Sequence, residues 1–271
     1  MTRLCEADIC DIRNNLFEYD KILKRKIGAN LSEIAAYAVN MDLKILRKKF
    51  IKEKIAVIPI TTGLGIIKGF SETVCSIINF LGIESFVTNK SDVAGIGEAI
   101  NRGATQLFIA DDDTCSLINL RQNIVADNSI CTGMGFAAAL TYKLKSVNKK
   151  TVVVLGAGPV GRSATKFLVE HGADVILYDI DEEKSNLLKN EEHVKIVSNI
   201  TQALKENNIY FEATTALNVI KDEYIDENTI IAAPGIPLGI SKKVFDNYKD
   251  NVIHDALEIG VASMVFFALR R

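Results

Sequence analysis

A short glycine pattern behind a β-branched run constrains the fold more than any other feature of the chain. The segment T-V-V-V-L-G-A-G-P-V-G places Gly156, Gly158 and Gly161 at G-x-G-x-x-G spacing. The first glycine permits a sharp turn out of the strand, the second lets backbone approach a pyrophosphate, and the third lets the next helix pack closely on the strand. The pattern predicts a Rossmann dinucleotide-binding domain, in which Pro159 and Val160 open the helix whose N-terminus receives the phosphates.

The second predicted strand of this domain, 174–178, ends at a carboxylate. Asp179 lies 23 residues beyond Gly156, close to the roughly 20-residue offset of the carboxylate that holds the ribose 2′-OH of NAD. Such a carboxylate repels the 2′-phosphate of NADP, and Ile180 and Asp181 supply no basic group to hold that phosphate. NAD is therefore the predicted cofactor, and a glycine turn in a protein without a cofactor is the alternative.

Two later loops of small residues are expected to line the nicotinamide and its ribose. They follow the predicted strands 209–212 and 229–232, and loops at the carboxyl ends of parallel strands border the crevice that holds the cofactor. Ordinary turns are the alternative for each loop. The candidate cofactor-binding residues in these loops are Ala213, Thr214, Thr215, Pro234, Gly235 and Ile236.

The length of the chain and the alternation of its elements predict a second α/β domain before the glycine pattern. A chain of 271 residues is long for one domain and comfortable for two. Short β-branched runs alternate with helical patterns there, which is typical of a parallel sheet. We expect an α/β fold with two Rossmann-like domains and a helical N-terminal extension. The expected parts are N-terminal helices at 1–54 that belong to the substrate domain and include a lid, a Rossmann-like substrate-binding domain at 55–148, an NAD-binding Rossmann domain at 149–258, and a C-terminal helix at 259–271.

Charge and composition argue against several other classes of protein. The net charge of −2 gives no basic field for nucleic acid or for a membrane surface. No apolar run approaches the roughly 18–20 residues that span a bilayer, and the N-terminal segment does not resemble a secretory signal, so we expect a cytoplasmic protein. The five cysteines and three histidines lack the spacing of a disulfide framework or a zinc site, and no bound metal is expected.

Polar residues follow the predicted strands of the first domain, where a substrate site is expected. Thr61 and Thr62 follow the first strand, three aspartates at 111–113 follow the third, and Thr132 comes later. The three aspartates suit either a solvated helix cap or a grip on an ammonium group, and Asp255 adds another carboxylate in the second half. Such acidic groups suit the oxidation of a cationic amine. No Ser-His-Asp or Cys-His set points to nucleophilic catalysis.

Several short motifs on both sides of the glycine pattern carry a family resemblance. They are I-P-I-T-T-G-L-G-I-I-K-G-F-S, S-F-V-T, A-D-D-D-T, N-L and C-T-G before it, and F-E-A-T, P-G-I-P and G-V-A-S-M after it. In order and spacing they resemble the pyrrolysine synthase family (pyrrolysine biosynthesis protein PylD) from about Ile55 to Met264, while the first 50 residues match only loosely. Three positions depart from the family pattern, because Leu64 replaces Asn, Pro159 replaces a basic residue and Glu258 replaces Gly.

The resemblance implies NAD-dependent oxidation of the terminal amine of L-lysine-Nε-3R-methyl-D-ornithine, a small isopeptide of lysine and methylornithine. Cyclisation with release of ammonia then gives the pyrroline ring of L-pyrrolysine. The resemblance also implies a homodimer. By the match, Asp111 binds the substrate amine, Leu4 belongs to a lid over the substrate, Asp255 occupies an acidic position, and the pocket is lined by Thr61, Thr62, Ile67 and Thr132.

Two other functions remain open from the sequence. One is another double-Rossmann NAD-dependent amine or amino-acid dehydrogenase that acts on an ornithine-like substrate, and such an enzyme has no need of the T-T-G-L-G and C-T-G loops. The other is a non-catalytic protein that senses NAD or serves as a scaffold, which would bind NADH without transferring hydride to any amine.

Overall fold

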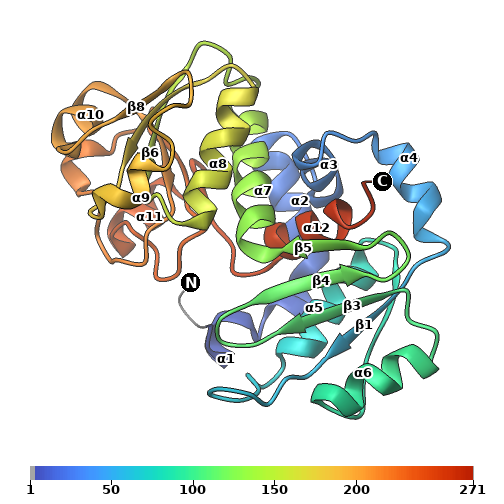
Figure 1. Ribbon diagram of the computed structural model, residues 1–271. Coiled ribbons are helices and arrows are strands. Elements are labelled where there is room, and N and C mark those ends of the chain that lie inside the picture. The colour runs from blue at the N-terminus through green and yellow to red at the C-terminus, as the bar shows by residue number, and fades with distance from the viewer. Residues whose placement is uncertain (1–3, 271) are drawn as a thin grey trace. The chain divides into compact units, whose positions relative to one another are not determined.

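Each of the two units of the structure is assembled from separate stretches of the chain. The computed structural model describes residues 4–270 (Figure 1). Unit 1 contains Arg25–Ala29 and Gly133–Asp255, and unit 2 contains 4–24, Asn30–Thr132 and 256–270. Two helices, α2 (Ile12–Ile27) and α7 (Asn128–Lys143), carry residues of both units.

Unit 1 is built on a six-stranded sheet in which every pair of neighbouring strands is parallel. The strand order is β11-β10-β9-β6-β7-β8, so the first strand of the unit lies inside the sheet and the chain reverses its direction of travel there. This is the doubly wound order of dinucleotide-binding folds, and it confirms the predicted Rossmann fold. The elements are β6 (Thr151–Leu155), α8 (Pro159–Glu170), β7 (Asp174–Tyr178), α9 (Glu182–Asn186), β8 (Val194–Ile196), α10 (Ile200–Glu206), β9 (Ile209–Glu212), the 3₁₀ helix η1 (Asp222–Tyr224), β10 (Ile230–Ala232), α11 (Lys242–Tyr248) and β11 (Val252–Ile253).

Strand β6 has the composition of a strand that is covered on both faces. Each residue from Val152 to Leu155 is 0% exposed, which explains why the run is apolar without alternation. Val153 and Leu155 pack with Tyr210 of β9 in one cluster. The buried face of α8 carries Ala164 and Leu168, among others. The predicted segments of this unit are therefore real elements, but the strand β8 was not predicted, because a strand of three residues is too short to show a hydrophobic pattern.

Unit 2 has a mixed sheet, which differs from the parallel sheet expected from the sequence. The strand order is β2-β1-β3-β4-β5. Strands β2, β1 and β3 are parallel to one another, β4 is antiparallel to β3, and β5 is antiparallel to β4. Strands β4 and β5 were not predicted from the sequence. The acidic residues after β3 resemble the start of a loop that ends the sheet, whereas they form the tight turn of a β3–β4 hairpin. The strands are β1 (Lys54–Ile58), β2 (Glu84–Val87), β3 (Gln106–Ala110), β4 (Cys115–Asn119) and β5 (Ile124–Asp127).

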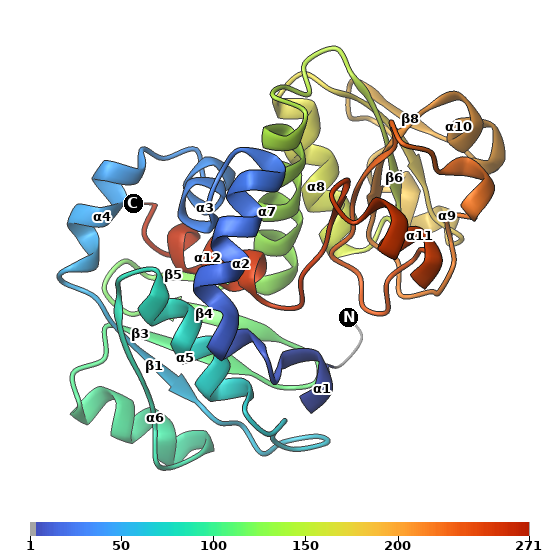
Figure 2. The same ribbon diagram turned by 180° about the vertical axis from the view of Figure 1, so that it is seen from behind.

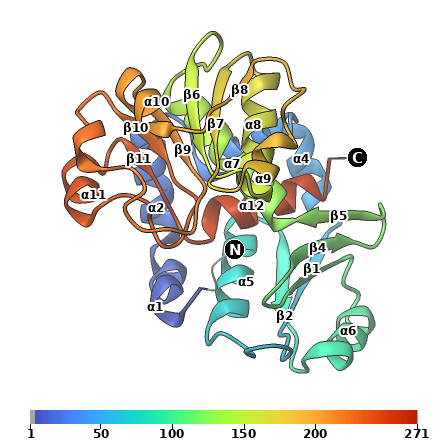
Figure 3. The ribbon, with the colours of Figure 1, turned by 60° about the vertical axis from the view of Figure 1, so that its left-hand side comes forward.

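Helices cover both faces of the unit 2 sheet. Helices α5 (Phe70–Phe80) and α6 (Asp92–Asn101) lie on opposite faces (Figure 3), and Ala56 and Ile58 of β1 pack against Ala99 of α6. The other helices of the unit are α1 (Glu6–Ile9), α3 (Leu31–Ala38), α4 (Leu43–Phe50) and α12 (Glu258–Phe267).

The C-terminal helix α12 forms the centre of the unit 2 core. All its residues are buried, as a helix that is apolar on every side requires. It packs against α3, α5, β4 and β5, and Figure 2 shows α3 alongside it. At Gly260 a Cβ would lie 2.8 Å from the Thr132 hydroxyl oxygen, so a side chain at this position would require Thr132 to move.

We expect Gly161→Ala to destabilise unit 1 by about 2–3 kcal/mol, because overpacking of this size has that cost. A Cβ at Gly161 would lie 1.8 Å from the Gly156 carbonyl oxygen. Gly97→Ala is the control, since Gly97 lies within a helix and a Cβ there meets no atom within 4 Å; it should stabilise the protein by about 0.5–1 kcal/mol. Urea unfolding of both variants measures the difference, and a Gly161→Ala variant as stable as wild type would contradict the packing.

Candidate functional site

The turn between β6 and α8 uses its three glycines in three different ways. Gly156 has a left-handed φ of +94°, and a Cβ there would lie 2.7 Å from the Ala213 carbonyl oxygen. Gly161 is pressed against the Gly156 carbonyl. By contrast, a Cβ at Gly158 would meet no atom within 4 Å. Packing therefore requires two of the glycines, and the third leaves open space beside the backbone at the start of α8.

The N-terminus of α8 is suited to receive an anion. Gly158 is the N-cap and supplies no side chain to bond the first N–H groups, and Pro159 occupies a first-turn position where its missing N–H costs nothing. The helix dipole adds partial positive charge at this end. The guanidinium of Arg162 donates to the Ala157 carbonyl oxygen at 2.6 Å. This bond holds a full positive charge beside the glycine turn. The sequence analysis did not single out Arg162.

Asp179 is bonded to the glycine turn itself. Its Oδ2 accepts the Ala157 N–H at 2.6 Å, and its Oδ1 accepts the Asp181 N–H at 2.8 Å. The side chain is half-buried, and Ile180 beside it is 91% exposed. The carboxylate therefore lies next to the turn at the end of β7, as the spacing predicted, and each oxygen retains a lone pair for a hydroxyl donor.

A buried glutamate lies beneath the loops that follow β9 and β10. Glu212 is 0% exposed, its Oε1 accepts from the Thr214 N–H at 2.8 Å and from the Thr214 hydroxyl at 2.5 Å, and its Oε2 accepts from the Gly239 N–H at 3.2 Å. Burial raises the pKa of Glu212, and the hydrogen bonds from Thr214 and Gly239 oppose that shift. The two loops were predicted from the sequence to line the cofactor, but no role was predicted for the Glu212 side chain.

In unit 2, carboxylates fix the loop that follows β1. Asp92 accepts the Thr61 N–H at 2.8 Å and the Thr61 hydroxyl at 2.6 Å, while Asp112 accepts the Leu64 N–H at 2.6 Å. The bonds from the hydroxyl and then the N–H of Thr61 lower the pKa of Asp92. These groups follow β2, β1 and β3, whose carboxyl ends meet at one edge of the sheet. Thr62 is exposed there.

Asp111 lies in the hairpin turn between β3 and β4. Its Oδ1 accepts the N–H groups of Thr114 at 2.7 Å and Asp113 at 2.9 Å. These backbone bonds, first from Thr114 and then from Asp113, hold the pKa of Asp111 below its ordinary value. The turn is exposed, so Asp111 is a charged group at the sheet edge. Of the two roles considered for the three aspartates, a helix cap is wrong, because they lie in a hairpin turn.

The remaining substrate-site candidates lie at several places in the two units. Thr132 lies in α7 and donates to the Asn128 side-chain oxygen at 3.2 Å. Ile67 is half-buried and precedes α5, and Leu4 is half-buried just before α1 begins. Asp255 is half-buried and belongs to unit 1, where it follows β11. The structure therefore groups Thr61, Thr62 and the acidic turn at one sheet edge.

The positions that depart from the family pattern have ordinary structural settings. Leu64 is 80% exposed and engages Asp112 through its backbone. Glu258 begins α12, is 6% exposed, and accepts the Leu257 N–H at 3.1 Å. Pro159 has the first-turn position in α8 described above.

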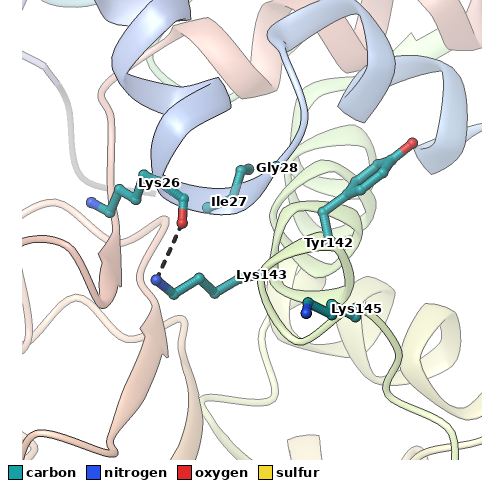
Figure 4. A pocket seen from close by; sticks show the side chains of 6 residues that line it. All are labelled: Lys26, Ile27, Gly28, Tyr142, Lys143 and Lys145. Atoms are coloured by element: carbon teal, nitrogen blue, oxygen red, sulfur yellow. Dashed lines mark hydrogen bonds between the residues drawn. The ribbon is translucent and has the colours of Figure 1, made fainter.

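A cavity of about 390 Å³ in unit 1 lies away from the glycine turn (Figure 4). The ammonium of Lys143 donates to the carbonyl oxygens of Lys26 at 3.2 Å and Asp250 at 2.9 Å, and Lys26 donates to Val252. Burial lowers the pKa of Lys26 to about 8. These bonds place the cavity near the amino end of β11, whereas the candidate site is at the carboxyl ends. Its lining residues are Lys26, Ile27, Gly28, Tyr142, Lys143 and Lys145.

The described residues form neither a metal site nor a membrane-spanning helix. Within 4–270, no group of three or more His, Cys, Asp or Glu side chains is arranged to hold a metal ion. In the same part of the chain, no helix combines the length and apolarity that crossing a membrane requires.

Each half of the chain is similar to a known protein family. Residues 8–126 match the family model "Pyrrolysine biosynthesis protein PylD, N-terminal domain", and residues 139–231 match "Shikimate / quinate 5-dehydrogenase". The pyrrolysine synthase of Methanosarcina acetivorans is 33% identical over 99% of this chain and 100% of its own length. The pyrrolysine synthase of Methanosarcina barkeri is also 33% identical, over 99% of this chain and 98% of its own length.

A solved structure supports the fold independently of these relatives. Quinate dehydrogenase from Corynebacterium glutamicum, in complex with NAD, superposes with a TM-score of 0.54 at 14% identity, over 80% of this chain and 93% of that chain. At that identity, the likeness concerns the fold alone.

Proposed function

The chain belongs to the pyrrolysine synthase family, and from this premise we propose that it uses NAD to oxidise the terminal amine of L-lysine-Nε-3R-methyl-D-ornithine, which then cyclises to L-pyrrolysine. The near full-length identity of 33% to two pyrrolysine synthases is the observation that carries the proposal. The unit 1 site and the acidic sheet edge of unit 2 supply the two kinds of group that the reaction needs.

The glycine turn fits a dinucleotide. The open space beside Gly158 leaves room for a pyrophosphate, and the N-terminus of α8 with Arg162 supplies positive charge for it. Asp179 is placed by its bond to Ala157 to accept a ribose hydroxyl. Its charge disfavours a 2′-phosphate, which supports NAD over NADP.

The acidic edge of unit 2 fits a cationic amine. Asp111 keeps a lowered pKa, so its carboxylate is charged at neutral pH and attracts an ammonium group. Asp92 and Asp112 hold the loop of Thr61 and Thr62, and we assign that loop, with Ile67 and Thr132, to the wall of the substrate site. Leu4 is assigned to a lid that excludes water, because an imine formed from the amine hydrolyses readily.

The proposed reaction balances without any further reagent. Bound NAD⁺ supplies the acceptor for the hydride that leaves the carbon next to the amine. The ammonium also releases one proton, so R–CH₂–NH₃⁺ becomes R–CH=NH₂⁺. The α-amine of the ornithine part then forms a bond to this carbon, and the original nitrogen departs as ammonium. The product is a five-membered cyclic imine. Turnover of this isopeptide with NAD, compared with free ornithine, tests the proposal against a general amine dehydrogenase.

We expect Asp179→Ala to weaken NAD binding about tenfold and to reduce the preference for NAD over NADP, because a charge-assisted hydrogen bond is lost. Calorimetric titration of both cofactors measures the effect. Asp174→Ala is the control, since Asp174 begins the same strand and pairs with His193. An unchanged cofactor preference in Asp179→Ala would remove this residue from the ribose site.

Asp111→Asn should raise KM for the isopeptide several-fold or lower kcat, while the Kd for NAD stays as in wild type. The loss of charge weakens the attraction of the ammonium, whereas the amide oxygen can still accept the turn N–H groups. Asp113→Asn is a matched change in the same turn and should leave the kinetics near wild type. Equal kinetics in the two variants would mean that Asp111 has no special role.

A further inference from the structure

We propose that Glu212 is a positioning residue that holds two loops, 213–218 and 233–240, in the arrangement that receives the nicotinamide end of the cofactor. This inference rests on the proposed function, because it concerns the binding of NAD. The residue lies at the end of β9, within the F-E-A-T motif, and has no part in the hydride and proton steps described above.

The two carboxylate oxygens of Glu212 serve different loops. Oε1 accepts both the N–H and the hydroxyl of Thr214, at 2.8 and 2.5 Å, in the loop after β9. Oε2 accepts the N–H of Gly239 at 3.2 Å, in the loop after β10. The side chain is 0% exposed, so these bonds have no competition from solvent. One buried group thus ties both loops together, and Gly239 is 27 residues from Glu212 along the chain.

Two glycines of the second loop pack closely against the Glu212 side chain and its partner Thr214. A Cβ at Gly239 would lie 2.4 Å from Glu212 Cδ, and a Cβ at Gly235 would lie 2.6 Å from the Thr214 carbonyl oxygen and 3.2 Å from Glu212 Oε2. The first loop also contacts the glycine turn, since the Ala213 carbonyl oxygen fills the space where a Cβ of Gly156 would be. Glu212 therefore connects the fingerprint turn, through its neighbour Ala213, with both later loops.

The chemistry of the contacts requires a carboxylate rather than an amide. Donors approach both oxygens, and a glutamine has only one acceptor oxygen, so its NH₂ group would face an N–H group on one side. Burial penalises the charged form and raises the pKa of Glu212; the groups that contact the carboxylate, Thr214 and Gly239, do not titrate. A side chain needed only to fill space would be less costly as a neutral residue. The hydrogen bonds to both loops account for an acid at this buried position.

Glu212→Gln tests this role against Glu53→Gln, a matched change in unit 2. Glu53 is also buried, at 7% exposure, and accepts from Thr105 and Gln106 side chains at 2.6 and 2.9 Å. We expect Glu212→Gln to raise the Kd and KM for NAD about tenfold, with KM for the isopeptide within about twofold of wild type. Amide hydrogen exchange in both loops should accelerate in the cofactor-free protein. Glu53→Gln should change none of these quantities.

A second variant keeps the test open if Glu212→Gln does not fold. Thr214→Val removes the hydroxyl, which donates to Glu212 and accepts the Ala216 N–H, and it retains the backbone donor to Glu212. A smaller rise in the Kd for NAD is therefore expected. Unchanged NAD affinity in a folded Glu212→Gln protein, or an equal loss in Glu53→Gln, would overturn the inference while leaving the proposed function intact. A wild-type protein that binds no NAD would overturn both.

Discussion

The contact between Gly161 and the Gly156 carbonyl oxygen is the constraint on which the rest of unit 1 depends. It draws the start of α8 against the end of β6, and no residue with a Cβ fits at that distance. The same turn receives the Ala213 carbonyl on one side and offers its Ala157 N–H to Asp179 on the other. The ends of β6 and β9 thereby meet through backbone contacts, the Asp179 side chain joins the end of β7 to the same turn, and the helix N-terminus faces the space that remains.

Both units use carboxylates to hold loops at the carboxyl ends of their strands. Asp92 and Asp112 bind the loop after β1, and Glu212 binds the loops after β9 and β10. Their surroundings differ, with consequences for charge. The pKa of Asp92 falls because the hydroxyl and then the N–H of Thr61 stabilise its charge, whereas burial raises that of Glu212. Asp111, exposed in its turn and with a lowered pKa, is suited to hold a cation, whereas buried Glu212 is shielded from solvent and is suited to fix geometry.

Features encoded by local pattern were predictable, and features that depend on distant contacts were not. The glycine turn and Asp179 follow from spacing along one βαβ unit. Strands β4 and β5 were missed because the four-residue acidic turn between β3 and β4 carries no hydrophobic pattern. Asp92 reaches a partner 31 residues away, and Glu212 one 27 residues away, so sequence spacing alone gives no sign of either pairing. An acid at the end of the apolar strand I-Y-F, followed by small residues, was the available signal for Glu212.

We propose that a pyrophosphate rests against the open backbone at Gly158, and replacing this glycine with valine tests its place directly. The fold has room for the new side chain, since a Cβ there meets no atom within 4 Å, but the side chain would occupy the space assigned to the phosphates. Titrating NAD into both proteins by calorimetry should show one equivalent bound by wild type and none by a Gly158→Val variant of unchanged circular dichroism. Equal binding of NAD by the two proteins would show that the pyrophosphate does not lie at Gly158.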